Sequence, residues 1–325
     1  MKSEEVKEKG EGKVKIYAVV GPTASGKSAL ALELARRHGG EIISCDSMQI
    51  YKTMDIGTAK PTPEELRLVP HHMIDVVEPT ESFSCADYVE MADSIVRDVI
   101  SRGKIPIFCG GTGLYLDSLL RGKNFDEGLT DDLLRAELLE YAERHGAHAL
   151  HERLEAIDPE SAASIHENNV KRVARAIEIY ELSGIPKSEI DRRSREVAPR
   201  FEISAIGLNY SNRDELYRRI DARVDIMMAE GLEAETRALY EAGVFEVNST
   251  AAQAIGYKEL MGYIRGEESL EAAVERLKMA TRRYAKRQIT WFSSKPYVTQ
   301  LDVCGADGTK TFEEIVNIAE SLFFN

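Results

Sequence analysis

The chain has 325 residues, of which 43% are hydrophobic, and a formal net charge of −13. This length can build two or three compact units with cores of their own, and no stretch approaches the ~18 consecutive apolar residues of a membrane helix, so we expect a soluble, cytoplasmic monomer with no membrane partner. The acidic balance argues against nucleic acid as a partner, because phosphate backbones are bound through Lys and Arg, unless a basic segment stands out locally.

The N-terminal part of the chain contains a phosphate-binding motif. A charged segment, residues 1–12, for which we expect disorder, is followed by an apolar run at 13–20 that is typical of a buried parallel strand. The sequence GPTASGKS then leads into a helical pattern, which is the context of a P-loop. Its N–H groups, lysine and hydroxyl hold a diphosphate or triphosphate, and the motif alone does not say which. The candidate phosphate ligands are Gly21, Pro22, Thr23, Ala24, Ser25, Gly26, Lys27 and Ser28, and the hydroxyl of Ser28 is the candidate Mg²⁺ ligand.

Two further strands end at polar side chains. The second apolar run ends at Asp46, which places a carboxylate at the carboxyl edge of the sheet, where open α/β sheets bind ligands. An N-cap or a turn residue is the alternative for this aspartate. A strand, glycine turn and helix recur at 104–120, with Thr112 as the polar group of the turn and three glycines that keep side chains away from whatever approaches. By itself this second turn is weak evidence for a site.

The stretch between these strands predicts ordinary structural elements. A short strand is expected within 71–79, and an amphipathic helix at 83–103 with Ser84 as its N-cap and Gly103 as its stop. His71 and His72 have no third metal ligand at a suitable spacing, so we expect structural histidines. The cysteines have no CxxC spacing and predict neither disulfides nor a zinc site, only small buried side chains; they are Cys45, Cys85, Cys109 and Cys304.

The second half of the chain begins with helices only. Residues 126–199 predict an all-helical insertion, 200–210 a strand that returns to the parent sheet, and 211–243 a long helix. Arg219 and Arg223 lie four residues apart on one face of that helix. A solvated face is the usual explanation, although the neighbours of Arg223 are apolar.

A basic segment at 276–295 contains seven Lys or Arg and no acidic residue. Tyr284, Trp291 and Phe292 lie among them and would add stacking surfaces, so we predict nucleic-acid binding rather than a solvated face. A last strand and helix follow. The fold class is therefore α/β, with a P-loop NTPase-like parallel sheet core at 13–125, an inserted helical domain at 126–199 and the second part of the core at 200–325.

The joint occurrence of several motifs resembles one family. Beyond GPTASGKS, the chain contains CDSMQIYKTMDIGTAKP, IPIFCGGTGLYLDSLL, AIGYKEL and AKRQITWF in this order. With them it resembles the bacterial tRNA dimethylallyltransferases over nearly its whole length, apart from residues 1–12. The resemblance implies that the loop holds dimethylallyl diphosphate with Mg²⁺ and that N6 of adenine 37 in tRNA attacks the prenyl group.

The resemblance also implies roles for individual residues. Asp46 would be the general base, and Thr112 and Arg223 would act beside it on the diphosphate. The candidate tRNA contacts are Asp46, Ser47, Met48, Gln49, Thr112, Arg135, Lys171, Arg172, Arg175, Gln253, Gly256, Lys258, Arg283, Lys286, Arg287 and Gln288.

Three alternatives remain open at this stage. A small-molecule kinase would bind ATP in the same loop and direct Asp46 at a hydroxyl, but it leaves the basic segment and the insertion without a task. An adenylate prenyltransferase acting on free AMP would share the core, and the segments that match tRNA contacts disfavour it. A non-catalytic RNA-binding P-loop protein would not depend on Asp46 for any activity.

Overall fold

The computed structural model describes residues 13–121, 130–196, 198–305 and 308–324. The charged segment 1–12, for which we expect disorder, lies outside the described residues. The chain divides into two compact units, one formed by residues 1–117 and 201–325 and the other by residues 118–200. Within the described residues, no helix combines the length and apolar character that crossing a membrane requires.

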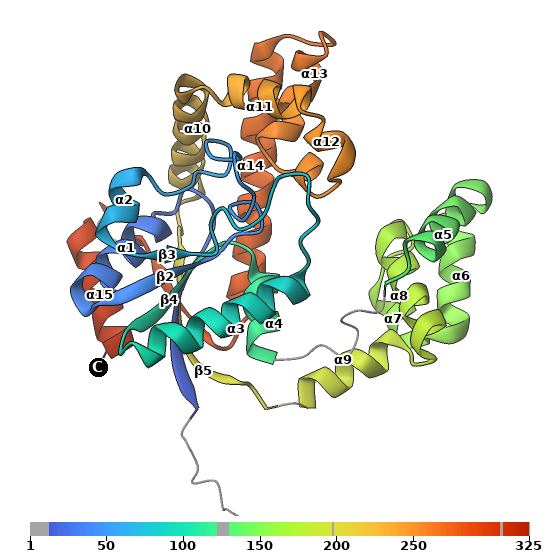
Figure 1. The fold of residues 1–325 in the computed structure, drawn as a ribbon, viewed down its shortest axis with the longest axis horizontal. Coiled ribbons are helices and arrows are strands. Elements are labelled where there is room, and N and C mark those ends of the chain that lie inside the picture. Colours follow the sequence, from blue (N-terminus) through green and yellow to red (C-terminus); the bar gives the residue numbers. More distant parts are fainter. Residues whose placement is uncertain (1–12, 122–129, 197, 306–307, 325) are drawn as a thin grey trace, which may run out of the picture. The chain divides into compact units, whose positions relative to one another are not determined.

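The first unit is built on a six-stranded sheet with the strand order β3-β2-β4-β1-β5-β6 (Figure 1). Every neighbouring pair in this sheet is parallel, as the continuous apolar strands predict. The strands are β1 (Val14–Val20), β2 (Gly40–Cys45), β3 (His71–His72), β4 (Ile105–Gly110), β5 (Phe201–Asn209) and β6 (Val298–Asp302). The strand expected within 71–79 is thus only two residues long.

The register of the sheet aligns the ends of three strands. Val20 of β1 and Cys45 of β2 both pair with Gly110 of β4. The segments that follow these residues therefore leave the same edge of the sheet side by side. They are the P-loop, Asp46 and the glycine turn that carries Thr112.

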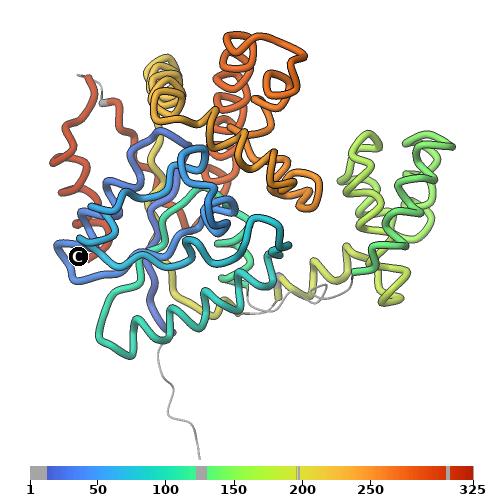
Figure 2. Tube along the Cα trace, turned by 45° about the horizontal axis from the view of Figure 1, so that its top comes forward, coloured from blue at the N-terminus to red at the C-terminus, as the bar shows by residue number. Residues whose placement is uncertain are grey.

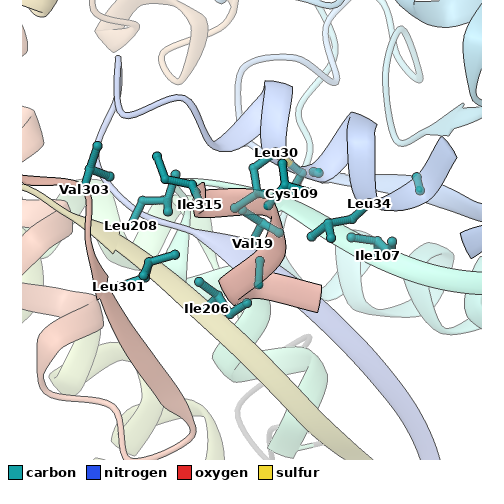
Figure 3. Close-up of a cluster of buried hydrophobic side chains, with 14 of the residues drawn as sticks. Val19, Leu30, Leu34, Ile107, Cys109, Ile206, Leu208, Leu301, Val303 and Ile315 are labelled. Carbon is teal, nitrogen blue, oxygen red and sulfur yellow. The ribbon is translucent and has the colours of Figure 1, made fainter. Parts of the chain in front are cut away.

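Helices cover both faces of the sheet (Figure 1). On one face lie α1 (Lys27–His38) and α15 (Phe312–Phe324), and on the other lie α3 (Cys85–Ser101) and α4 (Gly113–Arg121). Figure 3 shows the core under the first face, where Leu30 and Leu34 of α1 are fully buried against strand residues such as Val19 and Ile107. Burial of each such leucine contributes about 1.5–3 kcal/mol, which fixes the helix behind the P-loop on the sheet.

The predicted helix at 83–103 is confirmed. Ser84 and Asp87 form a reciprocal capping box at its start, and Gly103 follows its last turn with a φ of 70°. A short helix, α2 (Pro63–Leu68), lies in the connection before it. His71 and His72 are structural, since they bond to the Val69 carbonyl and the Glu41 carboxylate respectively.

The expectation of four buried cysteines is half correct. Cys45 and Cys109 are buried, whereas Cys85 and Cys304 are only partly buried, and all four are free thiols.

The long helix expected at 211–243 is two helices. Gly231 adopts a left-handed conformation, with a φ of 104°, and separates α10 (Arg213–Glu230) from α11 (Leu232–Glu241). The chain continues through α12 (Val244–Val247), a 3₁₀ turn η1 (Ala251–Gln253), α13 (Tyr257–Ile264) and α14 (Leu270–Ser293). These helices gather beside the sheet in both views (Figures 1 and 2) and share a core with residues 50–54 of the loop after β2.

The second unit contains helices only, among its described residues. They are α5 (Asp132–His145), α6 (Ala147–Ile157), α7 (Pro159–Ser164), α8 (Val170–Ser183) and α9 (Lys187–Glu196), around a core that includes Leu138, Leu150 and Val173. The Arg200 N–H donates to the Leu120 carbonyl at 3.1 Å, so the two ends of this unit meet. A two-stranded ladder of β7 (Cys304–Gly305) and β8 (Gly308–Thr309) belongs to the first unit.

Candidate active site

The P-loop adopts a backbone that only some residues tolerate. Gly21 and Gly26 have φ values of 143° and 92°, and a side chain on Gly21 would lie 2.8 Å from the Leu208 carbonyl. Ala24 also has a positive φ, 62°, which is costly for a residue with a Cβ. The surrounding structure must therefore hold this loop in place.

Two residues that we did not assign to the site support the loop from outside. Arg219 Nε donates to the Ala24 carbonyl at 2.9 Å, and the buried Tyr210 hydroxyl donates to the Ser25 carbonyl at 3.2 Å. Arg219 is exposed, as a solvated face predicts, but its guanidinium also supports the P-loop, which that interpretation does not include. The spacing of Arg219 and Arg223 on one helix face was the available signal, and the structure places that face toward the P-loop.

Two cations lie in a cavity at the edge of the sheet. Lys27 is partly buried, and the loss of hydration lowers its pKa, as does the neighbouring charge of Arg223. Burial likewise lowers the pKa of Arg223, and its Nε is buried without a hydrogen-bond partner. The carboxylate of Asp46 opposes both shifts. Two positive charges thus lie where an anionic ligand would compensate them.

Asp46 is both a turn residue and a residue of the cavity wall, so both interpretations of its position are correct. Its Oδ1 accepts the N–H of Met48 at 3.0 Å, as expected of a turn residue, and its side chain also lines the cavity. Among the described residues no hydrogen bond involves Oδ2. One oxygen therefore fixes the orientation of the carboxylate, and the other is available for proton transfer.

Thr112 lies next to the cavity rather than on its wall. Its Oγ1 accepts the N–H of Ser47 at 3.1 Å and donates to the Ser47 hydroxyl at 3.3 Å. Its own N–H donates to the Cys45 carbonyl. Thr112 therefore fixes the turn that follows Asp46.

The glycines of this second turn allow close approach. A side chain on Gly110 would overlap the Cys45 backbone, one on Gly111 the Gln288 amide, and one on Gly113 the Trp291 ring. The approaching groups are thus the neighbouring strand and α14. Steric fit, rather than a ligand, accounts for these glycines.

The cavity has a volume of about 450 Å³ and collects predicted residues from five segments. Those that line it are Thr23, Lys27, Ser28, Asp46, Ser47, Met48, Gln49, Arg223, Gln253, Gly256, Arg287 and Gln288. The other P-loop residues, with Thr112, Lys258, Arg283 and Lys286, are not on its wall.

The loop between β2 and α2 is fastened to α11. Glu235 accepts the backbone N–H groups of Asp55, Ile56 and Gly57 at 2.9–3.1 Å, and the Tyr257 hydroxyl donates to the same carboxylate at 2.6 Å. Sequence reasoning missed Glu235, because nothing in its local pattern distinguishes it from a surface glutamate. This contact places the loop over the cavity.

Most of the positive charges of the basic segment at 276–295 are compensated by acidic residues in the fold. Four of its seven cations form ion pairs, namely Arg276 with Glu268, Lys278 with Asp225, Arg282 with Asp221, and Lys295 with Asp117. The remaining three, Arg283, Lys286 and Arg287, are exposed at spacings of three and four residues and have no ion pair within the described chain. These three form the available basic face of α14.

The aromatic residues of this segment have three different environments. Phe292 is 2% exposed and belongs to the core, so its prediction as a stacking surface is wrong. Trp291 packs against Gly113, with the Lys295 ammonium 4.6 Å from its ring centroid. Tyr284 lines the cavity, and burial raises the pKa of its hydroxyl. Of the three, only Tyr284 lines the cavity.

Gln253 and Gly256 line the cavity, and together with the neighbouring Lys258 they form a rim of it. Gly256 has a φ of 109° and begins α13, and Lys258 Nζ donates to the Gln253 side chain at 2.6 Å. Gln253 and Lys258 are exposed, so this rim is available to a large ligand.

The second unit uses two of its predicted arginines internally. Arg135 and Arg175 both pair with Glu178, a fully buried carboxylate, at 2.9 and 3.0 Å. Lys171 and Arg172 are exposed at the start of α8. An internal role thus accounts for Arg135 and Arg175, and it neither requires nor forbids the predicted RNA contact.

The oxygen donors of the cavity suit Mg²⁺ only together with a ligand. Ser28 and Asp46 supply a hydroxyl and a carboxylate, and the described residues contain no cluster of three His, Cys, Asp or Glu that could hold a metal alone. Mg²⁺ commonly binds through one or two protein oxygens plus phosphate oxygens. The donor set fits that mode of binding.

Comparison with known proteins agrees with these observations. The family described as IPP transferase matches residues 49–295, and the one described as isopentenyl transferase matches residues 14–80. The tRNA dimethylallyltransferase of Caldanaerobacter subterraneus subsp. tengcongensis is 47% identical over 95% of this chain and 98% of its own length. That of Geobacillus thermodenitrificans is 49% identical over 89% and 90%.

Solved structures give the same result. The full-length tRNA isopentenylpyrophosphate transferase of Bacillus halodurans superimposes with a TM-score of 0.68 at 43% identity, over 96% of this chain and 97% of that one. A eukaryotic dimethylallyltransferase acting on tRNA gives a TM-score of 0.76 at 32% identity, over 89% and 74%. The resemblance predicted from the sequence motifs is confirmed, and this chain belongs to the IPP transferase family, among the tRNA dimethylallyltransferases.

Proposed function

We propose that this protein transfers the dimethylallyl group of dimethylallyl diphosphate to N6 of adenosine 37 in tRNA, giving N6-dimethylallyladenosine and diphosphate. The observation that carries this proposal is the cavity itself. The aligned strand ends bring the P-loop and Asp46 to one edge of the sheet, where Lys27, Arg223 and Asp46 line a single cavity.

The P-loop and the two buried cations serve the leaving group. As the C1–O bond of the donor breaks, its electron pair passes to the diphosphate, whose negative charge must be stabilised. Lys27 and Arg223, together with the amides of the loop, supply that stabilisation in a site that already disfavours uncompensated positive charge. Ser28 and the diphosphate oxygens would hold Mg²⁺, which adds further positive charge to the leaving group when it is bound.

Asp46 serves the nucleophile. The amine of adenine is a weak nucleophile because its lone pair is delocalised into the ring. As N6 forms its bond to C1, it must lose a proton, and Oδ2 of Asp46 is the acceptor that we assign. General base catalysis of this kind contributes about 10²- to 10⁴-fold.

The surroundings of the cavity serve tRNA recognition. An adenine in the anticodon loop has to leave its stack to reach Asp46, which costs a few kcal/mol. Tyr284 lines the cavity that would receive the adenine, on which an aromatic ring can stack. The exposed cations of α14 and the rim at Gln253 and Lys258 would bind the RNA backbone, as would Lys171 and Arg172 of the second unit.

One experiment tests the reaction directly. The protein is incubated with unmodified tRNA, Mg²⁺ and dimethylallyl diphosphate, and position 37 is examined by mass spectrometry for the mass of one dimethylallyl group. Parallel incubations with ATP in place of the prenyl donor, and with AMP in place of tRNA, address the kinase and adenylate prenyltransferase alternatives. An unchanged adenosine 37, or prenylation of AMP but not of tRNA, would refute the proposal.

A further inference from the structure

Gln288 occupies an unexpected position on α14. The buried residues of this helix, Ala273, Leu277, Thr281, Ala285, Gln288 and Phe292, recur every three or four positions and form one stripe. Gln288 is 4% exposed on this stripe, although the two residues before it, Lys286 and Arg287, belong to the exposed basic face. A glutamine on the core side of a helix needs partners for both ends of its amide.

The partners of Gln288 belong to two different loops. The N–H of Thr23 in the P-loop donates to Oε1 at 2.8 Å, and Nε2 donates to the Gly111 carbonyl at 3.2 Å. Thr23 and Gly111 are 265 and 177 residues away from Gln288 in the sequence. One side chain thus connects the diphosphate cradle to the turn that carries Thr112.

The Gly111 backbone packs closely against the amide of Gln288. A Cβ on Gly111 would overlap Nε2 of Gln288, so the turn approaches the amide as closely as a backbone can. The oxygen of Gln288 also occupies the Thr23 N–H, and that N–H is therefore not a donor to the diphosphate. The bond between Thr23 and Gln288 fixes the P-loop backbone, and with it the orientation of the other N–H groups of the loop.

We propose that Gln288 is a positioning residue, which holds the P-loop and the Gly110–Gly113 turn at a fixed separation and thereby sets the affinity of the cradle for diphosphate. The proposal rests on the diphosphate site of the proposed function. It replaces the contact with tRNA predicted for this residue, because both ends of the amide are engaged by the protein backbone. On α14 the amide that holds the loops belongs to the buried stripe, whereas the three cations that would hold RNA are exposed.

A pair of variants on α14 separates the two roles. Gln288→Met keeps the length and volume of the side chain but leaves the Thr23 N–H and the Gly111 carbonyl without partners. We expect the Kd for inorganic pyrophosphate, measured by calorimetry, and the KM for dimethylallyl diphosphate each to rise about tenfold. The Kd for tRNA and its salt dependence should stay within twofold of the wild type. Lys286→Met, on the exposed face, should give the reverse pattern.

Gln288→Glu provides a readout that a general loss of stability would not produce. An ionised glutamate still accepts from Thr23 but cannot donate to Gly111, whereas a protonated one restores both bonds. The pyrophosphate affinity of this variant relative to that of the wild type should therefore recover as the pH falls from 7.5 to 5.5. The ratio cancels the titration of pyrophosphate itself.

The outcomes are distinct. If wild-type protein fails to bind pyrophosphate, the proposed function fails. If the wild type binds it but Gln288→Met binds it equally well, or loses tRNA affinity instead, the positioning role is wrong. It is also wrong if Gln288→Met is unstable and Gln288→Glu shows no recovery at low pH.

Discussion

Lys27 and Arg223 show how single residues prepare this site. Burial lowers the pKa of both, so the folded protein holds two cations whose charged forms it partly disfavours. At a pH below its ordinary pKa, each of these side chains would be charged in the unfolded chain, and burying that charge costs free energy on folding. Binding of an anion to the folded protein removes this cost. A diphosphate ligand should therefore raise the pKa of Lys27.

This coupling predicts proton uptake. Between the lowered pKa of free Lys27 and its higher value in the complex, binding of pyrophosphate should take up protons at Lys27, and affinity should fall as the pH rises through this range. Calorimetry in buffers of different ionisation enthalpy measures the uptake. The titration of pyrophosphate is removed by subtracting the result for Lys27→Met. Identical proton counts for the two proteins would contradict the assignment of Lys27.

Asp46 permits an isosteric test of the base. Asp46→Asn retains the bond from Met48 to Oδ1 but removes the proton acceptor, so single-turnover prenyl transfer should slow by at least ~10². The Kd for tRNA should stay within a few-fold. Asp55→Asn, a change in the same loop at a carboxylate paired with Lys60, is the matched control and should react at close to the wild-type rate. A near-normal rate for Asp46→Asn would exclude this residue as the base.

At the scale of elements, α14 illustrates how a fold redistributes charge. The cations of α14, with Lys295 just beyond its end, divide into those that face acidic residues of α10, α4 or the α13–α14 connection and those that face solvent. The burial pattern of the helix also explains why Gln288 and Phe292 behave differently from the residues around them. The rest of the protein thus decides which side of the helix is available to RNA.

The division of charges predicts different salt dependences. The double variant Arg283→Ala/Arg287→Ala should raise the Kd for tRNA and flatten the slope of log K against log salt by up to about one unit per lost phosphate contact. In the matched double variant Arg276→Ala/Arg282→Ala, which removes paired cations, the slope should not change. Filter binding from low to high salt measures both. Equal slopes for the two variants would contradict the assignment of the basic face.

At the scale of the whole molecule, the cavity lies at the carboxyl ends of the strands, and an ion pair of a buried carboxylate, which stabilises the sheet, lies at the other end of β2. Glu41 is the second residue of β2, at the end of the strand away from the cavity, and is 3% exposed. The Arg102 guanidinium, bonded to both of its oxygens, lowers the pKa of Glu41 to about 2, and a bond from His72 contributes. Stability from this group is therefore complete above the ordinary carboxyl pKa and is lost as the pH falls through the folded value.

A pH series of unfolding measurements tests this expectation. Between about pH 4.5 and pH 2, the wild type should lose up to about 3 kcal/mol of unfolding free energy through Glu41. Glu41→Gln should be less stable at pH 7 and lose less over the same range. Denaturant titrations at each pH give the values. A constant difference between the two proteins across the series would show that Glu41 does not titrate in this way.

The sequence alone determined the parts that depend on local pattern. The P-loop, the position of Asp46 at a strand end, the capped helix at 83–103 and the helical character of 126–199 all follow from spacings within a few residues. A strand that is buried on both faces must be apolar, a P-loop needs glycines at fixed positions, and a helix start needs a cap. Those constraints act along the chain, so they can be predicted without a fold.

Only the tertiary structure decided which side chains meet across the chain. Glu235 holds a loop 178–180 residues away, Arg219 supports the P-loop, and Gln288 connects two loops that are far apart in sequence. The same holds for the four ion-paired cations of the basic segment at 276–295, because the prediction of nucleic-acid binding treated that whole segment as one basic surface. Hydrogen bonds and ion pairs act over a few ångströms, and the register of the sheet and the packing of the helices determine which groups come within that distance.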